Sequence, residues 1–242
     1  LGAEISPDGK YIAYRRLVPK MPFDGPDGGA DTEIHVLDLG AGGKGKSRPF
    51  VTAKGSQGGV AWTPDGKAIT FLTARKGDSG RALYRIPIDG GEATRWYGHS
   101  SSITEYSIHP DGKTVAFVAS ESSDNGAGGA KGKGFNQEIF EEQVLPKSLW
   151  IAELGKADSA TKVSVKGSPS APQWSPDGAN LAVAIAPSAR IDDHYMARKV
   201  HVMDRSGKTV AVVQNPGKLG QIAWSPDSEH LAMISGADVN DP

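Results

Sequence analysis

Cysteine is absent from this chain of 242 residues. The sequence therefore excludes disulfide scaffolds, iron–sulfur clusters, thiolate zinc sites and cysteine nucleophiles, because each of these needs a cysteine sulfur. The redox compartment stays undecided, since a chain without cysteine reports on neither an oxidising nor a reducing environment.

An excess of one charge is also missing, because 27 Lys and Arg balance 28 Asp and Glu and leave a formal charge of −1. This balance predicts neither the basic footprint of a nucleic-acid-binding protein nor a polybasic membrane patch. Long apolar runs are missing too, and the run over residues 181–186 is far shorter than the roughly 20 residues that span a bilayer. We therefore expect no nucleic-acid partner and no membrane insertion.

Glycine and proline, in contrast, are abundant. The 31 Gly and 16 Pro make up about a fifth of the chain, where average usage gives roughly 12%. The chain is therefore dense in turns, and its length suits a single all-β domain. It begins at Leu1 without a methionine or a signal peptide, so we expect that a segment precedes it.

One short phrase, Ser/Thr/His-Pro-Asp followed by Gly or Ser, recurs five times. Its prolines are 57, 46, 66 and 50 residues apart, and the shorter spacings approach the period of about 40–45 residues of a four-stranded propeller blade. Proline presets the second turn residue, Asp bonds its own backbone and Gly takes the left-handed conformation, so each copy predicts a hairpin turn. The turn residues are Pro7, Asp8, Gly9, Pro64, Asp65, Gly66, Pro110, Asp111, Gly112, Pro176, Asp177, Gly178, Pro226 and Asp227.

Strand-forming segments surround each turn. An apolar strand precedes each copy and a β-rich strand follows it, and four of the five units add a third and a weaker fourth strand. The expected fold is an all-β propeller of four-stranded antiparallel blades, about four and a half of them, and hence an incomplete ring. The expected blades span residues 1–54, 55–99, 100–167, 168–216 and, in part, 217–242.

Tryptophan stands directly before the turn phrase in three copies, as Trp62, Trp174 and Trp224. Because this position recurs at one phase of the repeat, we expect these rings to pack between blades and not to form a platform for substrate stacking. His109 replaces the usual Ser or Thr of the phrase, and we expect it to be structural.

The Trp-Ser-Pro-Asp-Gly-Lys phrase and the Ile-Ala-Phe-like strand after it resemble the β-propeller repeats of TolB, which the propeller domains of the prolyl oligopeptidase family share. The opening residues 2–14 and the acidic segment 141–150 resemble the acylaminoacyl-peptidase and dipeptidyl-peptidase branch of that family. The resemblance covers the whole chain and is specific for architecture, much less so for activity.

This resemblance implies three alternatives for function. In the prolyl oligopeptidase family the propeller caps an α/β-hydrolase domain, so this chain would gate or select peptide substrates for a C-terminal hydrolase domain in the same polypeptide. A TolB-like chain would be a periplasmic scaffold that binds protein partners, and a periplasmic or secreted location is favoured. A propeller fused to another hydrolase, such as an amidohydrolase, is the third alternative.

The end of the chain bears on this choice. The sequence stops midway through its fifth unit, so we expect a fragment of a longer protein, which favours a hydrolase fusion over a self-contained scaffold. An open arc of blades also exposes strand edges, and we expect the isolated chain to associate with itself through them.

Long connections between the second and third strands occur in three units, at residues 17–32, 120–147 and 187–198. Insertions at one phase of a repeat map to one rim of the assembly, which is often the binding face. The candidate substrate-contact residues on these connections are Glu141, Glu142, Asp192, Asp193, His194 and Tyr195.

Each acidic cluster on these connections has two interpretations. In dipeptidyl peptidases a Glu-Glu pair from a propeller insertion binds the free amino terminus of the substrate, and the resemblance implies that role for Glu141 and Glu142, with surface charge as the alternative. The carboxylates and imidazole of Asp192, Asp193 and His194 suit the start of a metal site. Ligands so close in sequence need further ligands from elsewhere, so a solvated loop is the simpler interpretation.

Two motifs that suggest chemistry lack the context for it. Residues 40–47 match the phosphate-binding P-loop pattern, but no helix-forming segment follows them, so we expect a hairpin loop. The Gly-Asp-Ser-Gly phrase at residues 77–80 matches the serine phrase of chymotrypsin-like proteases, yet it lies in a connection between strands. The chain has no Gly-x-Ser-x-Gly phrase, so we expect no catalytic residue, metal or cofactor in it, and the activity of the longer protein stays open.

Overall fold

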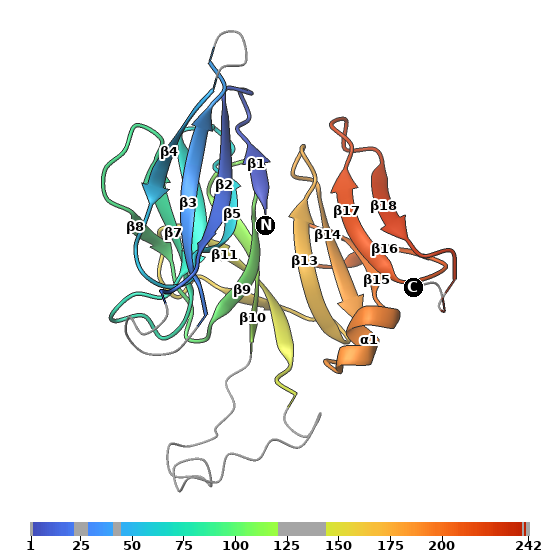
Figure 1. The fold of residues 1–242 in the computed structure, drawn as a ribbon. Coiled ribbons are helices and arrows are strands. Elements are labelled where there is room, and N and C mark those ends of the chain that lie inside the picture. The colour runs from blue at the N-terminus through green and yellow to red at the C-terminus, as the bar shows by residue number, and fades with distance from the viewer. Residues whose placement is uncertain (1, 22–28, 41–44, 121–143, 239, 241–242) are drawn as a thin grey trace, which may run out of the picture. The chain divides into compact units, whose positions relative to one another are not determined.

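A computed structural model describes residues 2–21, 29–40, 45–120, 144–238 and 240 (Figure 1). The regular secondary structure of the described residues is β-strand apart from one short helix, and the strands form four four-stranded antiparallel sheets and one two-stranded sheet. The prediction of an all-β chain built from four-stranded units is confirmed.

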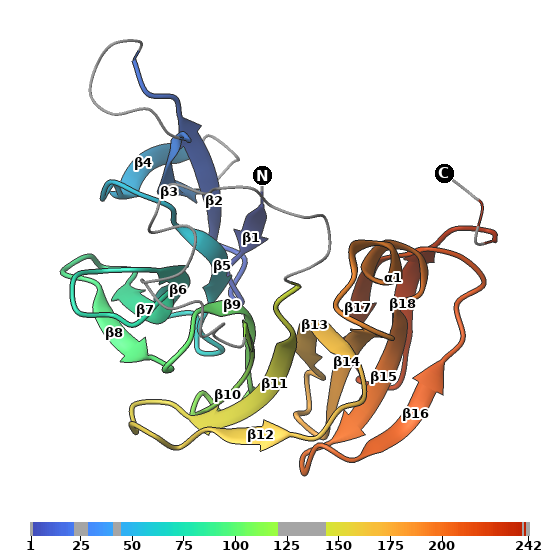
Figure 2. The same ribbon diagram turned by 90° about the horizontal axis from the view of Figure 1, so that it is seen from below.

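The strands of each sheet follow one another in sequence order, as they do in a meander (Figure 2). The first sheet contains β1 (Ala3–Ile5), β2 (Tyr11–Val18), β3 (Asp31–Asp38) and β4 (Lys46–Val51). The second contains β5 (Gly58–Trp62), β6 (Ala68–Thr73), β7 (Ala82–Pro87) and β8 (Thr94–Tyr97). The third contains β9 (Ile103–Ile108), β10 (Thr114–Ser120), β11 (Lys147–Glu153) and β12 (Thr161–Val163).

The fourth sheet contains β13 (Ser168–Trp174), β14 (Asn180–Ala186), β15 (Lys199–Asp204) and β16 (Thr209–Val213). The short helix α1 (Ile191–Met196) lies in the connection between β14 and β15. Two further strands, β17 (Leu219–Trp224) and β18 (Leu231–Ser235), pair with each other as a fifth, two-stranded sheet.

In the second, third and fourth sheets the second strand is the most deeply buried, because side chains cover it on both faces. Five of the six residues of β6 and six of the seven of β14 are buried. Strands buried on both faces have continuous apolar runs instead of alternation, and this explains the run that the sequence shows at residues 181–186. The outer strand β16 is mostly exposed, and Val210 is 56% exposed.

The chain divides into two compact units. The first comprises Leu1–Thr104, Asp111–Thr114 and Glu153–Ser159, and the remaining residues form the second. The core of the first unit joins side chains of the first two sheets, and the buried clusters of the second unit include one around Leu181 and one around Leu219. The largest core side chains of the first unit include Ile34, Ile69, Phe71 and Tyr84, and those of the second include Leu149, Leu181, Met203 and Leu219.

The repeated turn is held by its own side chains. In the first copy, Ser6 Oγ donates to Asp8 Oδ1 at 2.6 Å and accepts the main-chain N–H of Tyr11 at 3.0 Å. Asp8 Oδ1 also accepts the N–H of Lys10 at 3.1 Å, and Gly9 has a φ of 72°. These bonds explain why a hydroxyl residue opens the phrase, since it links both ends of the turn.

The tryptophans that precede the turn connect neighbouring sheets within each unit. Trp62 Nε1 donates to the main-chain oxygen of Glu4 at 2.9 Å, and Trp224 Nε1 donates to that of Gln173 at 3.0 Å. Trp174 instead meets the ring of His109 edge to face, with centroids 4.8 Å apart, and its buried Nε1 has no acceptor among the described residues. All three rings therefore join one sheet to the next.

In the described part of the chain, no helix has the length and apolar character needed to cross a membrane. The helix α1 has only six residues, and none of its side chains is buried.

Candidate functional site

The connections between second and third strands emerge at the end of each sheet that is opposite the Pro-Asp turns, which we call the insertion end. In the second unit this end carries α1, which contacts β14. Of the candidate residues, Glu141 and Glu142 lie outside the described residues. The other four lie together on α1.

The four candidates on α1 have different surroundings. Asp193 Oδ2 accepts a hydrogen bond of 2.5 Å from Ser188 Oγ, which fixes the start of the helix. Asp192 is exposed, and Tyr195 is 63% exposed and meets the ring of His194 edge to face. His194 lies close enough to charged groups of other elements, Lys147 and Glu105, for their charges to act on it.

His194 belongs to a group of four titratable side chains that we call the α1 cluster: Glu105, Lys147, His194 and Arg198. Burial lowers the pKa of His194 from its ordinary value, and the positive charges of Arg198 and Lys147 lower it further, while Glu105 opposes them. The imidazole is therefore favoured in its neutral form, which can donate and accept hydrogen bonds.

The remaining members of the α1 cluster are held by main-chain groups and by each other. Glu105 binds the N–H of Ala171 through Oε2 and faces Lys147 Nζ at 3.9 Å through Oε1. Arg198 donates from Nη2 to the main-chain oxygen of Leu219 at 2.7 Å. Ala171 has a φ of 47° and lies in a bulge of β13, which turns its N–H toward Glu105.

A hollow of about 360 Å³ lies beside this cluster. Lys147 and Lys162 are among its lining residues, and Pro146, Ser148 and residues 163–165 with Gly167 form the rest. Lys147 therefore belongs both to the hollow and to the α1 cluster. A surface with ammonium, guanidinium, imidazole and carboxylate groups is suited to hydrogen-bond a peptide backbone or its charged ends.

Sequence reasoning found only one member of the α1 cluster. The density of titratable groups at residues 192–195 pointed to His194, whereas Glu105 and Lys147 come from β9 and β11 and are far from it in sequence. Their proximity follows from strand register, which no local pattern contains.

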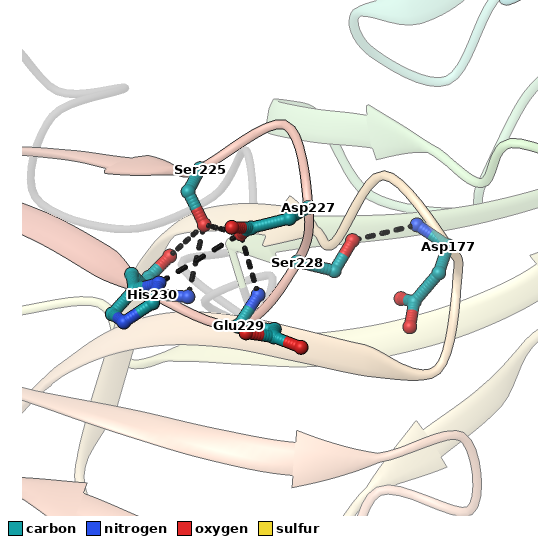
Figure 3. A network of polar contacts seen from close by, with 6 residues as sticks. All are labelled: Asp177, Ser225, Asp227, Ser228, Glu229 and His230. Atoms are coloured by element: carbon teal, nitrogen blue, oxygen red, sulfur yellow. Dashed lines mark hydrogen bonds and ion pairs between the residues drawn. The ribbon is translucent and has the colours of Figure 1, made fainter.

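A second group of possible metal ligands lies at the opposite, turn end of the second unit (Figure 3). One ligand atom each from Asp227, Glu229 and His230 lies within 4.8 Å of the others, and all three residues are exposed. Asp227 Oδ1, however, already binds Ser225 Oγ and the N–H of Glu229 at 3.0 Å. The hydrogen bonds of the turn therefore account for the position of this carboxylate without a metal ion.

The same turn contacts the turn of the preceding sheet. Ser228 stands where the other copies have glycine and has a φ of 65°, a conformation that costs energy in a residue with a Cβ. Its Oγ accepts the N–H of Asp177 at 3.0 Å, as Figure 3 shows. The fifth copy therefore replaces a glycine with a contact between turns.

The serine-protease-like phrase at residues 77–80 has a structural role. Asp78 is turned inward, with its side chain 5% exposed, and forms an ion pair with Arg95 Nε at 3.0 Å. It also accepts the hydroxyl of Tyr84 at 2.8 Å and the N–H of Arg75 at 2.9 Å. These contacts anchor the connection between β6 and β7.

The P-loop-like segment continues into a strand. Asp38 Oδ1 accepts the N–H of Gly40 at 2.9 Å, and β4 begins at Lys46. Residues 41–44 lie outside the described residues. A P-loop needs a helix at this point so that its N-terminus faces the phosphates.

Comparison with known proteins agrees with the propeller architecture. The chain is similar to TolB from Acinetobacter baumannii, with a TM-score of 0.57 and 18% identity over 86% of this chain and 41% of that one. It is also similar to a putative TolB from Agrobacterium tumefaciens, with a TM-score of 0.60 and 21% identity over 95% and 73% of the two chains. The fold is thus a β-propeller of the TolB type.

Other similar proteins have different descriptions. Hydrazine synthase of Kuenenia stuttgartiensis matches with a TM-score of 0.60 and 20% identity, over 98% of this chain and 71% of that one. Among curated sequences, the uncharacterized peptidase YuxL of Bacillus subtilis is 25% identical over 117 residues. The uncharacterized protein Atu1656 of Agrobacterium fabrum is 23% identical over 189 residues. No family model matches.

The aligned parts of the curated relatives are limited. The match covers 48% of this chain and 17% of YuxL, and 73% of this chain and 52% of Atu1656. The chain therefore spans about half the length of one relative and about a sixth of the other.

Proposed function

We propose that this chain is the non-catalytic propeller part of a larger serine peptidase, in which it selects peptide substrates for a downstream α/β-hydrolase domain. The observation that carries the proposal is the similarity over 117 residues to YuxL, which is described as a peptidase. The absence of a Gly-x-Ser-x-Gly phrase from the 242 residues accords with a role outside the chemical step.

The insertion end is where such selection would occur. The α1 cluster and the hollow beside it provide Lys147, Lys162, His194 and Arg198 as donors and Glu105 as an acceptor. A peptide presents main-chain amides and two charged ends, so this mixture of charges can discriminate between peptides by their termini. The pair Glu141 and Glu142 remains a candidate for binding a free amino terminus.

A protein-binding scaffold is the second candidate, and the similarity to two TolB structures favours it. A scaffold of this kind needs no hydrolase domain and would use the insertion end for a protein partner. A periplasmic or secreted location accords with it.

A fluorophosphonate probe tests the first candidate on the native protein. The probe attaches to the active serine of a serine hydrolase, because that serine is activated as a nucleophile. In a lysate of cells that produce the protein, we expect the labelled polypeptide to yield tryptic peptides from residues 1–242. The purified native protein should cleave short peptides and leave folded proteins intact.

An unlabelled native polypeptide contradicts the peptidase proposal, provided that other serine hydrolases of the same lysate are labelled. Chemical crosslinking then tests the second candidate function, a protein-binding scaffold. Crosslinks from α1 to a second polypeptide support it, and crosslinks to a hydrolase domain of the same polypeptide contradict it.

A further inference from the structure

Two arginines of the first unit lie at its insertion end and, among the described residues, have no anionic partner. Arg15 lies in β2, and Arg81 directly precedes β7. Both are half-buried. In the described part of the chain, neither guanidinium forms a hydrogen bond or an ion pair, and the buried Nε of Arg81 has no acceptor.

Each guanidinium lies over a glycine at the start of the first strand of a sheet, β1 or β5, which we call the inner strands. Arg15 Nη2 is 3.6 Å from the position that a Cβ would occupy on Gly2, just before β1. Arg81 Nη2 is 2.2 Å from the corresponding position on Gly58, the first residue of β5, so a Cβ there would displace the guanidinium from this place. The missing side chain of Gly58 thus leaves the space that the Arg81 guanidinium occupies.

The two inner strands bring these side chains together. β1 and β5 pack beside each other and run in the same direction toward their turns (Figure 2). Their first residues, and with them the two guanidinium groups, therefore lie at the same end of the first unit. Burial and then the charge of Arg15 lower the pKa of Arg81 from its ordinary value, as expected for neighbouring like charges.

Two like charges that are half-buried and uncompensated destabilise a folded protein, and such arrangements are typical of binding sites. A guanidinium presents a planar set of N–H donors that matches the oxygens of a carboxylate or a phosphate. We propose that Arg15 and Arg81 form an oxyanion-binding site at the insertion end of the first two sheets. Its ligand is a carboxylate or phosphate group of a small molecule or peptide.

This inference goes beyond the proposed function, because the site would be present in a peptidase propeller and in a scaffold alike. It rests on residues of the first unit, none of which belongs to the α1 cluster. Its failure would therefore leave the peptidase proposal standing, and an unlabelled serine probe would leave the oxyanion site standing.

The test is a titration of three probes into the whole 242-residue chain at constant ionic strength, with binding measured by NMR or calorimetry. The probes are acetyl-alanyl-alanine, which has a free carboxylate, its carboxamide, and inorganic phosphate. We expect the carboxylate, the phosphate or both to bind, and the carboxamide to bind at least about tenfold more weakly because it lacks the charge. The anion that binds more tightly identifies the ligand group as a carboxylate or a phosphate.

Three arginine variants locate the binding. Arg15→Gln and Arg81→Gln should each weaken it about tenfold, since a hydrogen bond to a charged group is lost. Arg16→Gln is the matched control, because Arg16 is the exposed neighbour on β2 and the substitution removes the same charge. Equal weakening by Arg16→Gln would overturn the proposal, since the effect would then be one of general charge.

Two glycine variants separate geometry from charge and from unfolding. Gly58→Ala keeps both arginines but places a methyl group where Arg81 Nη2 lies, so it should weaken binding. Gly2→Ala adds a methyl group at an ordinary contact distance from Arg15 and should leave binding unchanged. Thermal unfolding of both variants shows that they are folded. Unchanged binding in a folded Gly58→Ala variant, or no binding of either anion to the wild-type chain, would overturn the proposal.

Discussion

The indole Nε1 of Trp224 donates a hydrogen bond of 3.0 Å to the main-chain oxygen of Gln173, in the inner strand of the preceding sheet. Trp62 forms the equivalent bond to Glu4. Trp174, at the same phase of the repeat, packs against His109 and leaves its Nε1 without an acceptor. One position in the repeat therefore joins sheets in two ways.

This difference predicts the effect of removing the indole N–H alone. Replacement of Trp62 or Trp224 by benzothienylalanine, which has sulfur in place of the N–H, should lower the free energy of unfolding by about 1 kcal/mol. The same replacement of Trp174 should cost little or nothing, because its N–H is already unpaired. Urea denaturation followed by circular dichroism measures the three values, and an equal loss at all three positions would contradict the prediction.

Asp78→Asn should destabilise the first unit by about 2 kcal/mol, because the buried carboxylate loses its ion pair with Arg95 and one of its acceptor oxygens. Asp89→Asn is the control, since Asp89 is exposed. The same variant has a spectroscopic readout. Burial and, after it, the bond to Asp78 raise the pKa of Tyr84, so ultraviolet titration should show a lower Tyr84 pKa in Asp78→Asn. An unchanged Tyr84 pKa would contradict this account.

The turn aspartates predict a loss of stability in acid. The bonds from Ser6 and then from the N–H of Lys10 lower the pKa of Asp8 from 3.8 to about 2. A carboxylate with a lowered pKa in the folded state stabilises the protein above its unfolded pKa, and this contribution is lost as the pH falls toward the folded value. Stability should therefore decrease between about pH 4 and pH 2.

Acid denaturation of Asp8→Asn examines this contribution directly. The variant should be less stable at pH 6 and should lose less stability on acidification than the wild-type chain. Asp192→Asn, which removes an exposed carboxylate of α1, is the charge-matched control. The prediction fails if Asp8→Asn and Asp192→Asn lose the same amount of stability on acidification.

His194 predicts a second, milder dependence on pH. Its pKa in the folded chain lies below the ordinary 6.5, mainly through burial, so the neutral form is favoured and its contribution to stability is lost as the pH falls below 6.5. An NMR titration should find the midpoint below 6.5. Lys147→Gln should raise this midpoint and Glu105→Gln should lower it, and shifts in the opposite directions would contradict the arrangement of the α1 cluster.

The repetitive part of the fold could be predicted from sequence because its information is local. The Pro-Asp-Gly phrase specifies a turn by itself, and the strand after it, such as Ala68–Thr73, is marked by apolar and β-branched residues. The all-β class and the four-stranded units followed from these signals. The role of Trp62 in joining sheets followed from its phase.

The candidate site could be predicted only in part. The six-residue helix α1 was expected as a loop, because its apolar residues are exposed and give no helical pattern. Glu105 was missed, since its meeting with Ala171 depends on a bulge in β13. Arg15 and Arg81 were missed because each is unremarkable alone, and only the packing of β1 beside β5 brings them together.

The acceptors of the tryptophan N–H groups have a consequence for how such a chain can change. The oxygens of Glu4 and Gln173 are main-chain atoms, and every amino acid supplies one. The sheet that receives the bond can thus exchange its side chains without losing the connection, whereas the sheet that gives it must keep a tryptophan. A duplicated unit that contains the tryptophan can therefore form this bond with almost any preceding sheet. The bond thus favours growth of the repeat by duplication, after which the side chains of the preceding sheet can diverge.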